Sequence, residues 1–465
     1  MTESLAHSTA QELLQGYRSG GPSPVDAVDA TLARIDALNP KLNAFMLVDH
    51  AGARSAAEAS AKRWKTGDTL GPLDGVPVTI KDIILTEGWP TLRGSKTTDP
   101  HGPWTEDAPC TARLKEAGAI VLGKTTTPEF GWKGVTDSPL SGITRNPWNL
   151  ERTPGGSSGG AGAAAAAGMG ALHIGTDGGG SIRIPASFCG IVGHKPSFGR
   201  VPAYPLSPYG TIAHVGPMTR SVYDAALMLS VISAPDSRDC YVLPDSQQDF
   251  TQGLDAGIEG LRVAYSATLG GKRVDPEVAD LTAKAARRFE ELGAIVEEAD
   301  PGLERYAEVF ATLWFAGAGK VVAGIPADKH ALLDPGFLEI AQLGQQIGLH
   351  AYLDAAKLRE AITVAMCRFH ESYDLLLTPA LSLTAFPVGM PAPHHEGGAQ
   401  WVDWTPFSLP FNLTQQPAAS MPCGLSSEGL PVGLQIVGPR YRDDLVLRAA
   451  RAFETISPVV LPQIA

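Results

Sequence analysis

Residues 112–125 read ARLKEAGAIVLGKT, a helix-like run followed directly by an apolar run. Residues 112–117 fit a helix, whereas residues 119–122 fit a buried strand. Upstream, residues 76–80 (VPVTI) form another strand-like run, so strands and helices alternate along this part of the chain. Alternation of this kind predicts an α/β fold with a largely buried sheet.

The same stretch contains a nucleotide-binding pattern. Residues 118–125 match Gly-x4-Gly-Lys-Thr, the spacing of a phosphate-binding loop. In such a loop the intervening residues follow a strand and are themselves loop, whereas here they are apolar and follow a helix-like run. We therefore interpret the segment as helix, turn and buried strand, with nucleotide binding as the alternative.

The regions on either side have different patterns. Ser23-Pro24-Val25-Asp26 predicts a helix start, Asn39-Pro40 predicts its break, and residues 51–64 predict a second, largely exposed helix. We expect residues 1–70 to form a helical segment that packs on a larger unit, residues 71–465. Within that unit we expect a core region over 71–235, a remainder over 236–465 that completes the sheet and adds covering loops, a helix from 275 to about 292, and a surface loop over 379–398.

The composition excludes several classes of protein. The 465 residues are 44% hydrophobic and 18% charged, as in a compact globular protein and unlike a disordered one. The formal net charge of -12 disfavours nucleic acid as a partner, because phosphate binding needs clustered positive charge. No stretch reaches the roughly 18 apolar residues of a membrane span, and the first thirty residues lack the apolar run of a signal peptide. We therefore expect a soluble, cytoplasmic protein with no membrane contact.

Neither the cysteines nor the histidines predict a metal site. The five cysteines are odd in number, lie far apart and never form a Cys-x-x-Cys pair, so we expect scattered buried thiols. His394-His395-Glu396 has no third ligand at a suitable spacing, so metal binding there is only an alternative. His173 and His194 are expected to be core or supporting groups. We predict that the protein needs no metal and no cofactor.

Two clusters of glycine and serine flank an alanine-rich run, residues 163–167, that suits a helix close to neighbouring backbone. The first cluster, residues 155–160 (GGSSGG), contains Gly-x-Ser-x-Gly but lacks the hydrophobic strand that precedes the serine in α/β-hydrolases. The second, residues 175–183 (GTDGGGSIR), has three glycines before Ser181, so consecutive backbone N–H groups can face one small space. A nest of this kind stabilises a developing negative oxygen, and a tight turn without chemistry is the alternative.

Lys81 ends the apolar run that begins at Val76. One interpretation is a lysine that extends its ammonium group into solvent from a strand end. If the side chain is enclosed, desolvation lowers its pKa from about 10.4 toward neutrality and leaves an amine that can accept a proton. A base of that kind could serve a serine.

Together, in this order, these segments make the chain resemble the amidase signature family over nearly its whole length. The resemblance implies a mixed, twisted central sheet sandwiched between helices. It implies that Ser181 is the nucleophile, Lys81 the general base and Ser157 the bridging serine of a cis peptide bond. The matching segments are residues 75–82, 114–118, 123–125, 145–148, 154–160, 175–185, 410–414, 416–422 and 429–435.

The resemblance also assigns supporting roles to the loops. The backbone N–H groups of Gly178, Gly179, Gly180 and Ser181 correspond to the oxyanion hole. The side chains of Ser158, Asp177 and Arg183 match positions that orient the loops. Family members often have a larger residue where Gly178 stands, which implies a more mobile loop or a roomier pocket here.

Aromatic residues suggest where a substrate binds. Phe130, Gly131 and Trp132 stand where family members have acyl-pocket residues, with a core position as the alternative for Trp132. Residues Trp401, Trp404 and Phe407 form either an apolar lid or a hydrophobic loop anchor. Such surroundings favour an apolar or aromatic small-molecule substrate.

The resemblance implies an amidase that hydrolyses the C–N bond of carboxylic amides through a serine acyl-enzyme. Esters and carbamates (urethanes) are further candidate substrates, because the oxyanion geometry is shared and only the leaving group differs. One alternative is a glutaminase of the glutamine amidotransferase type, which supplies ammonia within a multi-protein complex. Another is an inactive scaffold that retains the fold. The sequence is compatible with a monomer or a homo-oligomer.

Overall fold

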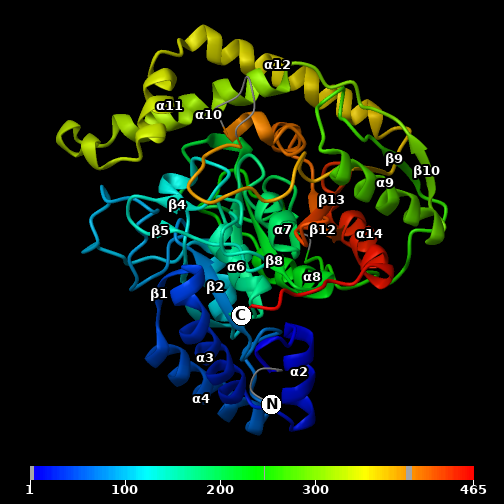
Figure 1. The fold of residues 1–465 in the computed structure, drawn as a ribbon. Coiled ribbons are helices and arrows are strands. Elements are labelled where there is room, and N and C mark those ends of the chain that lie inside the picture. The colour runs from blue at the N-terminus through cyan, green and yellow to red at the C-terminus, as the bar shows by residue number, and fades with distance from the viewer. Residues whose placement is uncertain (1–4, 246, 394–400, 465) are drawn as a thin grey trace.

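The computed structural model describes residues 5–245, 247–393 and 401–464, and an eleven-stranded sheet runs through its centre (Figure 1). Strand β2 is parallel to both of its neighbours, β3 and β6, whereas β8, β7, β12 and β13 pair antiparallel in succession. The predicted mixed α/β sheet is therefore confirmed. In spatial order the strands are β1 (Phe45–Val48), β3 (Ile120–Thr125), β2 (Pro77–Lys81), β6 (Leu172–Asp177), β8 (His214–Thr219), β7 (Val192–Lys195), β12 (Ala418–Leu425), β13 (Pro431–Val437), β11 (Leu375–Pro379), β9 (Arg262–Tyr265) and β10 (Ile295–Glu298).

Helices cover both faces of this sheet. The α-helices are α2 (Ala10–Ser19), α3 (Pro24–Leu42), α4 (His50–Thr66), α5 (Pro109–Glu116), α6 (Gly159–Ala166), α7 (Arg183–Cys189), α8 (Val222–Ile232), α9 (Pro276–Glu291), α10 (Tyr306–Ala323), α11 (Pro335–Gln345), α12 (Leu349–Phe369), α13 (Leu409–Leu413) and α14 (Asp443–Ile456). Shorter elements are the 3₁₀ turns η1 (Glu129–Gly131), η2 (Gly210–Ile212), η3 (Ala327–Leu332) and η4 (Trp401–Trp404), and the hairpin β4 (Asp137–Ser138) and β5 (Gly142–Ile143).

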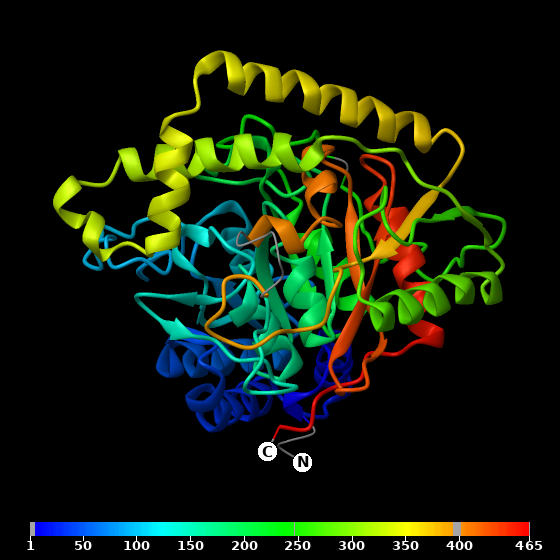
Figure 2. The same cartoon turned by 45° about the horizontal axis from the view of Figure 1, so that its top comes forward.

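Two apolar layers hold the helices to the sheet. Strand residues such as Val78 and Ile436 pack with α5, α8, α9 and α14 in the largest buried cluster. On the other face, α6 and α7 pack around Met218 of β8. Helices α2–α4 gather at one end of the molecule, and α10–α12 lie across the opposite end (Figures 1 and 2). No helix in the described ranges is long and apolar enough to cross a membrane.

The N-terminal helices differ from the prediction at one point. Helix α3 does not break at Asn39-Pro40 but continues through Pro40 to Leu42. The helix ends at Asn43, which takes a left-handed conformation with φ 49°, and the Asn39 side chain accepts hydrogen bonds from the N–H groups of Ala44 and Phe45. Pro40 has no N–H group, so one carbonyl group of the helix loses its partner, and the helix ends two residues later at Leu42. Residues 50–66 form the predicted exposed helix, α4.

The segment with the nucleotide-binding pattern is a buried strand. Gly118 makes a turn at φ 86°, and residues 120–125 form β3 between β1 and β2. Lys124 is buried and donates to the Thr91 hydroxyl and the Ile84 carbonyl. This arrangement confirms the interpretation as helix, turn and strand, because no loop remains to surround a phosphate.

Two expectations about exposure are only partly met. The cysteines are free, but Cys240 and Cys367 are exposed while Cys110 and Cys189 are buried. The expected surface loop begins at Pro379, the last residue of β11, and residues 380–393 form no helix or strand, yet Leu381 and Phe386 are buried against neighbouring aromatic rings. Proline and glycine therefore predicted the irregular backbone correctly but not its burial.

Candidate active site

Lys81 ends strand β2 inside the molecule and not in solvent. All five residues of this central strand are buried, and the Lys81 side chain has no exposed surface. Its Nζ atom lies 2.7 Å from Ser157 Oγ, 2.8 Å from Thr176 Oγ1 and 2.9 Å from Ser158 Oγ. Strand β2 thus places the Lys81 amine beside hydroxyl groups of both glycine- and serine-rich segments, residues 155–160 and 175–183.

The surroundings of Lys81 favour its neutral form. Burial lowers the pKa of Lys81 well below its usual value, and the negative charge of Asp177 opposes this shift only in part. In the described part of the chain, Lys81 forms no ion pair with a carboxylate, and its three hydrogen-bond partners are uncharged. Desolvation without a paired charge is the condition that turns a lysine into a base.

The hydroxyl groups around Nζ are not equivalent. Ser158 Oγ donates to the Thr176 carbonyl at 3.1 Å and accepts from the Thr176 N–H at 3.2 Å, so its proton is already used. A neutral amine has two N–H donors and one lone pair, and the lone pair needs a donor. Only the hydroxyl groups of Ser157 and Thr176 remain for that role. Ser157 therefore has the hydrogen-bonding freedom that a proton relay requires.

The two loops meet next to α6. The Gly156–Ser157 peptide bond is cis, as the resemblance implies, and the Ser158 N–H donates to the Ser181 carbonyl at 3.2 Å. Every residue of α6 is buried. A Cβ atom at Gly160 would lie 2.5 Å from the Thr126 nitrogen, so only glycine allows this approach of helix to strand end.

Ser181 is adjacent to this cluster but is not yet hydrogen-bonded to it. Ser181 and Ser157 line the same cavity, and the Ser181 side chain is nearly buried. Among the described residues, the Ser181 hydroxyl makes no hydrogen bond to Ser157. The hydrogen bond between Lys81 and Ser157 is therefore present, whereas one between Ser157 and Ser181 is not. Catalytic hydrogen bonds are often long before substrate binds and tighten in the complex.

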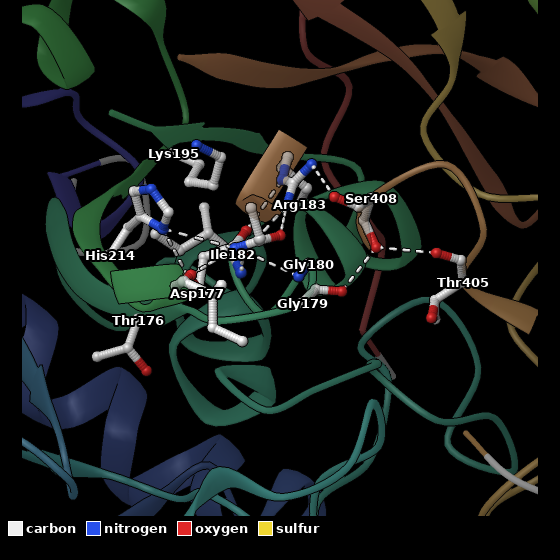
Figure 3. A network of polar contacts seen from close by, with 12 residues as sticks. Thr176, Asp177, Gly179, Gly180, Ile182, Arg183, Lys195, His214, Thr405 and Ser408 are labelled. Carbon is white, nitrogen blue, oxygen red and sulfur yellow. Dashed lines mark hydrogen bonds and ion pairs between the residues drawn. The ribbon is translucent and has the colours of Figure 1, made fainter. Parts of the chain in front are cut away.

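A buried ion pair holds the turn before Ser181 in place (Figure 3). The Arg183 guanidinium contacts Asp177 through two hydrogen bonds of 3.0 Å, and both side chains have no exposed surface. Burial alone would raise the pKa of Asp177, but Arg183 holds it below its usual range. The remaining donors of Arg183 reach the Ser408 carbonyl at 3.1 Å and the side-chain oxygens of Gln435 at 2.7 Å and Asn412 at 2.6 Å.

One N–H group of the predicted oxyanion hole is hydrogen-bonded within the turn itself. The Gly180 N–H donates to Asp177 Oδ1 at 2.7 Å, so it is already used within the turn. In the described ranges, the N–H groups of Gly178, Gly179 and Ser181 have no acceptor. Ser408 fixes the turn further, because its hydroxyl donates to the Gly179 carbonyl at 2.6 Å.

The cavity beside these serines has a volume of about 320 Å³. Phe130 and Gly131 line it, whereas Trp132 is buried in the core against Phe337 and does not. Trp401, Trp404 and Phe407 are also buried away from the cavity wall, which supports a loop anchor and not a lid. The sequence did not identify four further aromatic wall residues, Phe198, Tyr204, Tyr209 and Trp314.

Among the described residues, no histidine hydrogen-bonds to Lys81. Burial lowers the pKa values of His173 and His194, and these side chains hydrogen-bond to Thr79 and Asp443, respectively. His394-His395-Glu396 lies outside the described residues. Within the described residues, no group of three or more His, Cys, Asp or Glu side chains could hold a metal ion.

Several supporting residues were missed for identifiable reasons. Thr176 lies within the glycine- and serine-rich segment 175–183, directly before Asp177. Its position there could have predicted that it contacts the catalytic groups. Asn412, Gln435 and Ser408 contact the turn from more than 200 positions away, and nothing local predicts such contacts. Trp314 comes from α10, a helix whose sequence has no catalytic motif.

Comparisons with known proteins agree with this geometry. A family model described as Amidase matches residues 26–447. An acylamidase of Rhodococcus erythropolis is 38% identical over 467 residues, which cover 98% of this chain and 97% of that protein. A component of the glutamyl-tRNA(Gln) amidotransferase of Geobacter metallireducens is 35% identical, and the match covers 96% of each chain.

Solved structures of related proteins have a similar fold over nearly the whole chain. The crystal structure of a bacterial aryl acylamidase of the amidase signature enzymes superimposes with a TM-score of 0.91 at 32% identity, covering 97% of this chain and 96% of that one. The family model, the full-length relatives and this structural match all agree. The chain therefore belongs to the amidase signature family and is an amidase, a hydrolase that acts on carbon–nitrogen bonds other than peptide bonds.

Proposed function

We propose that this amidase hydrolyses small aryl or apolar amides through an acyl-enzyme on Ser181, with Ser157 and Lys81 as the proton relay. The observation that carries the proposal is the distance of 2.7 Å between Lys81 Nζ and Ser157 Oγ. The Lys81 amine is fully buried and, among the described residues, forms no ion pair with a carboxylate. An amine in this environment accepts a proton at neutral pH, whereas an exposed lysine does not.

In acylation, Ser181 Oγ attacks the substrate carbonyl carbon. Its proton passes to Ser157, and the Ser157 proton passes to Lys81. The tetrahedral oxyanion accepts hydrogen bonds from the free N–H groups of Gly178, Gly179 and Ser181. The relay then reverses and protonates the leaving nitrogen as the C–N bond breaks. In deacylation, water gives a proton to the same relay as its oxygen attacks the ester carbonyl. The bond between the acyl carbon and Ser181 Oγ then breaks, the relay returns the proton to Ser181, and the acid is released.

The cavity wall supports an apolar substrate. Phe130, Phe198, Tyr204, Tyr209 and Trp314 contribute rings to it, and most other lining residues are aliphatic, proline or glycine. Apolar surfaces of this kind bind rings and alkyl groups and leave the polar contacts to the reacting carbonyl. Esters and aryl carbamates present the same carbonyl to the serine, so they are included in the proposal.

A second candidate is hydrolysis of glutamine to supply ammonia. It is favoured by the full-length similarity to an amidotransferase component, and by Arg93 and Asp239, which line the same cavity. These side chains have the charges that a free amino acid's carboxylate and ammonium require. Ammonia release from glutamine, with no activity on anilides, would favour this candidate.

The test uses the chain alone. Purified protein is assayed against anilides, primary amides, aryl carbamates and glutamine, with Ser181→Ala as the matched control. We expect hydrolysis of an anilide or aryl carbamate without a partner protein, and labelling of Ser181 by a fluorophosphonate. Equal activity in Ser181→Ala, or no labelling, would overturn the proposal.

A further inference from the structure

Arg93 is a positively charged residue in the wall of the cavity that also contains Ser157. Its N–H donates to the Asp82 carbonyl at 3.0 Å, and its carbonyl accepts from the Phe130 N–H at 2.7 Å. Asp82 directly follows the lysine of the relay, and Phe130 directly precedes Gly131, where an added Cβ would lie 3.2 Å from Ser157 Oγ. The backbone of Arg93 is therefore anchored to two segments that border the relay.

The Arg93 guanidinium has no carboxylate partner. Among the described residues it forms no ion pair, and its side chain makes one hydrogen bond, from Nη1 to the Thr91 carbonyl at 3.2 Å. The nearby Asp82 carboxylate pairs instead with Lys124 at 3.6 Å and accepts from the Leu92 N–H at 3.3 Å. Burial lowers the pKa of Arg93, and the charge of Asp82 opposes this shift only in part. A half-buried cation without a counter-ion loses hydration that an anionic ligand would replace.

The second charged residue of the described cavity wall, Asp239, already has partners. Its two carboxylate oxygens accept hydrogen bonds of 2.8 Å from the N–H groups of Ala203 and Tyr241. Asp239 is also nearly fully buried. Of the two charges in this wall, Arg93 is therefore the one whose charged group lacks partners on most of its hydrogen-bonding atoms.

The free edge of the guanidinium has the shape that binds a carboxylate. With Nη1 on the Thr91 carbonyl, Nε–H and one N–H of Nη2 form a fork that has no acceptor among the residues described. Arg183 uses the same two atoms to hold Asp177, through two hydrogen bonds of 3.0 Å. Such a fork matches both oxygens of a carboxylate, whereas a single point charge does not.

We propose that Arg93 forms a carboxylate-binding subsite, and that the preferred amides carry a carboxylate group at a position away from the scissile bond. The inference rests on the proposed function, because it takes Ser181 as the nucleophile that fixes where the scissile carbonyl binds. Arg93 and Ser181 line one cavity, so a single small substrate can contact both. The aromatic and aliphatic wall binds the apolar part of that substrate. Arg93 thus selects the substrate and takes no part in the proton relay.

The test compares a carboxylate with a nitro group, which has the same planar shape but no net charge. The substrates are acetanilides and benzamides that carry either group at the meta or the para position, so that the substituted ring lies on the nitrogen side or on the acyl side of the amide. Selectivity is the ratio of kcat/KM for the carboxylate to that for the matching nitro compound. Each ratio is compared between enzymes, so the electronic effect of the nitro group on the amide cancels.

Arg93→Met keeps most of the apolar stem and removes the charge. It is expected to lower at least one ratio by about 5- to 30-fold, because hydrogen bonds to charged groups are stronger than neutral ones. The loss should appear mainly in KM, because the subsite binds a group remote from the reacting carbonyl. Arg93→Lys, which keeps the charge without the fork, should give an intermediate ratio, and Arg93→Gln repeats the test if the Met variant does not fold. Arg18→Met, which removes an exposed charge from α2, is the matched control and should leave every ratio unchanged.

The outcomes separate this inference from the proposed function. Unchanged ratios in a folded, active Arg93→Met or Arg93→Gln enzyme would overturn the inference. A wild type that hydrolyses the nitro compounds but none of the carboxylates would also overturn it, and so would an equal fall in Arg18→Met, which would indicate an effect of net charge alone. A wild type that is inactive on all of these amides, or activity that survives in Ser181→Ala, would instead overturn the proposed function.

Discussion

Lys81 owes its chemistry to where a strand places it. A lysine normally keeps its amine in water, but this side chain ends a central strand and contacts three hydroxyl groups. Lys81→Met keeps the length and apolar stem but removes the amine. We expect turnover of an anilide to fall by about 10² to 10⁴, the usual contribution of a general base. The melting temperature should not fall, because a buried amine is costly to desolvate. A folded variant with activity within a few-fold of the wild type would contradict the role of Lys81.

Thr176 tests the hydrogen bonds around the same amine. Thr176→Val removes the hydroxyl 2.8 Å from Nζ while keeping the shape of the side chain. The loss of one such hydrogen bond should lower kcat by about 2- to 10-fold, since a neutral hydrogen bond contributes about 0.5–1.5 kcal/mol. Thr176→Ser, which restores the hydroxyl, should recover most of the rate. Equal rates for the Val and Ser variants would show that the hydroxyl is not needed.

At the scale of elements, the turn between β6 and α7 depends on its buried ion pair. Arg183→Met leaves Asp177 buried without its cation, which typically costs about 3 to 5 kcal/mol. Arg183→Lys should not restore stability, because lysine cannot reproduce the two parallel hydrogen bonds to Asp177. Denaturant unfolding of the wild type, Arg183→Met and Arg183→Lys measures the free energy of unfolding of each. A stability within about 1 kcal/mol of the wild type for either variant would contradict the account of the turn.

Prediction from sequence succeeded where a local pattern decides the structure. The apolar run before Lys81 predicted a strand, and the helix-like run before Gly118 distinguished β3 from a phosphate-binding loop. It failed at Pro40, where the Asn39 side chain accepts the N–H groups that follow the helix. The use of the Gly180 N–H by Asp177 was also missed, because the direction of a side chain within a turn is not encoded in spacing.

At the scale of the whole molecule, acid should destabilise the fold through buried histidines. Burial lowers the pKa of His173 to about 3 and that of His370 to about 4, whereas both titrate near 6.5 in the unfolded chain. The unfolded chain then binds more protons, so the free energy of unfolding falls as the pH drops from about 6.5 toward 4. His173→Gln should reduce this fall by about 1.4 kcal/mol per pH unit. The same pH dependence in the variant, measured by denaturant unfolding, would contradict this.

Only the tertiary arrangement brings the remaining site residues together. Lys81, Ser157 and Ser181 share segments that a sequence motif can reveal. Trp314 comes from α10, which lies across one end of the molecule (Figures 1 and 2), and Asn412 belongs to α13, much later in the sequence. Their places depend on contacts between distant parts of the chain, such as the stacking of Trp314 on Tyr209 and the hydrogen bonds of Asn412 to Arg183 and Asp177, so local sequence patterns did not predict them.

The central claim is that Lys81 is a neutral amine when the enzyme works. Its protonation is measured most directly by titrating ¹³Cε-labelled lysine in the Ser181→Ala protein by NMR, with the Lys81→Met spectrum identifying the signal. Buried Lys124 and Lys195 also have lowered pKa values, about 8 and about 7, so this difference spectrum is essential. We predict that the Lys81 signal titrates well below the usual lysine pKa of about 10.4. A midpoint at or above that value would contradict the account.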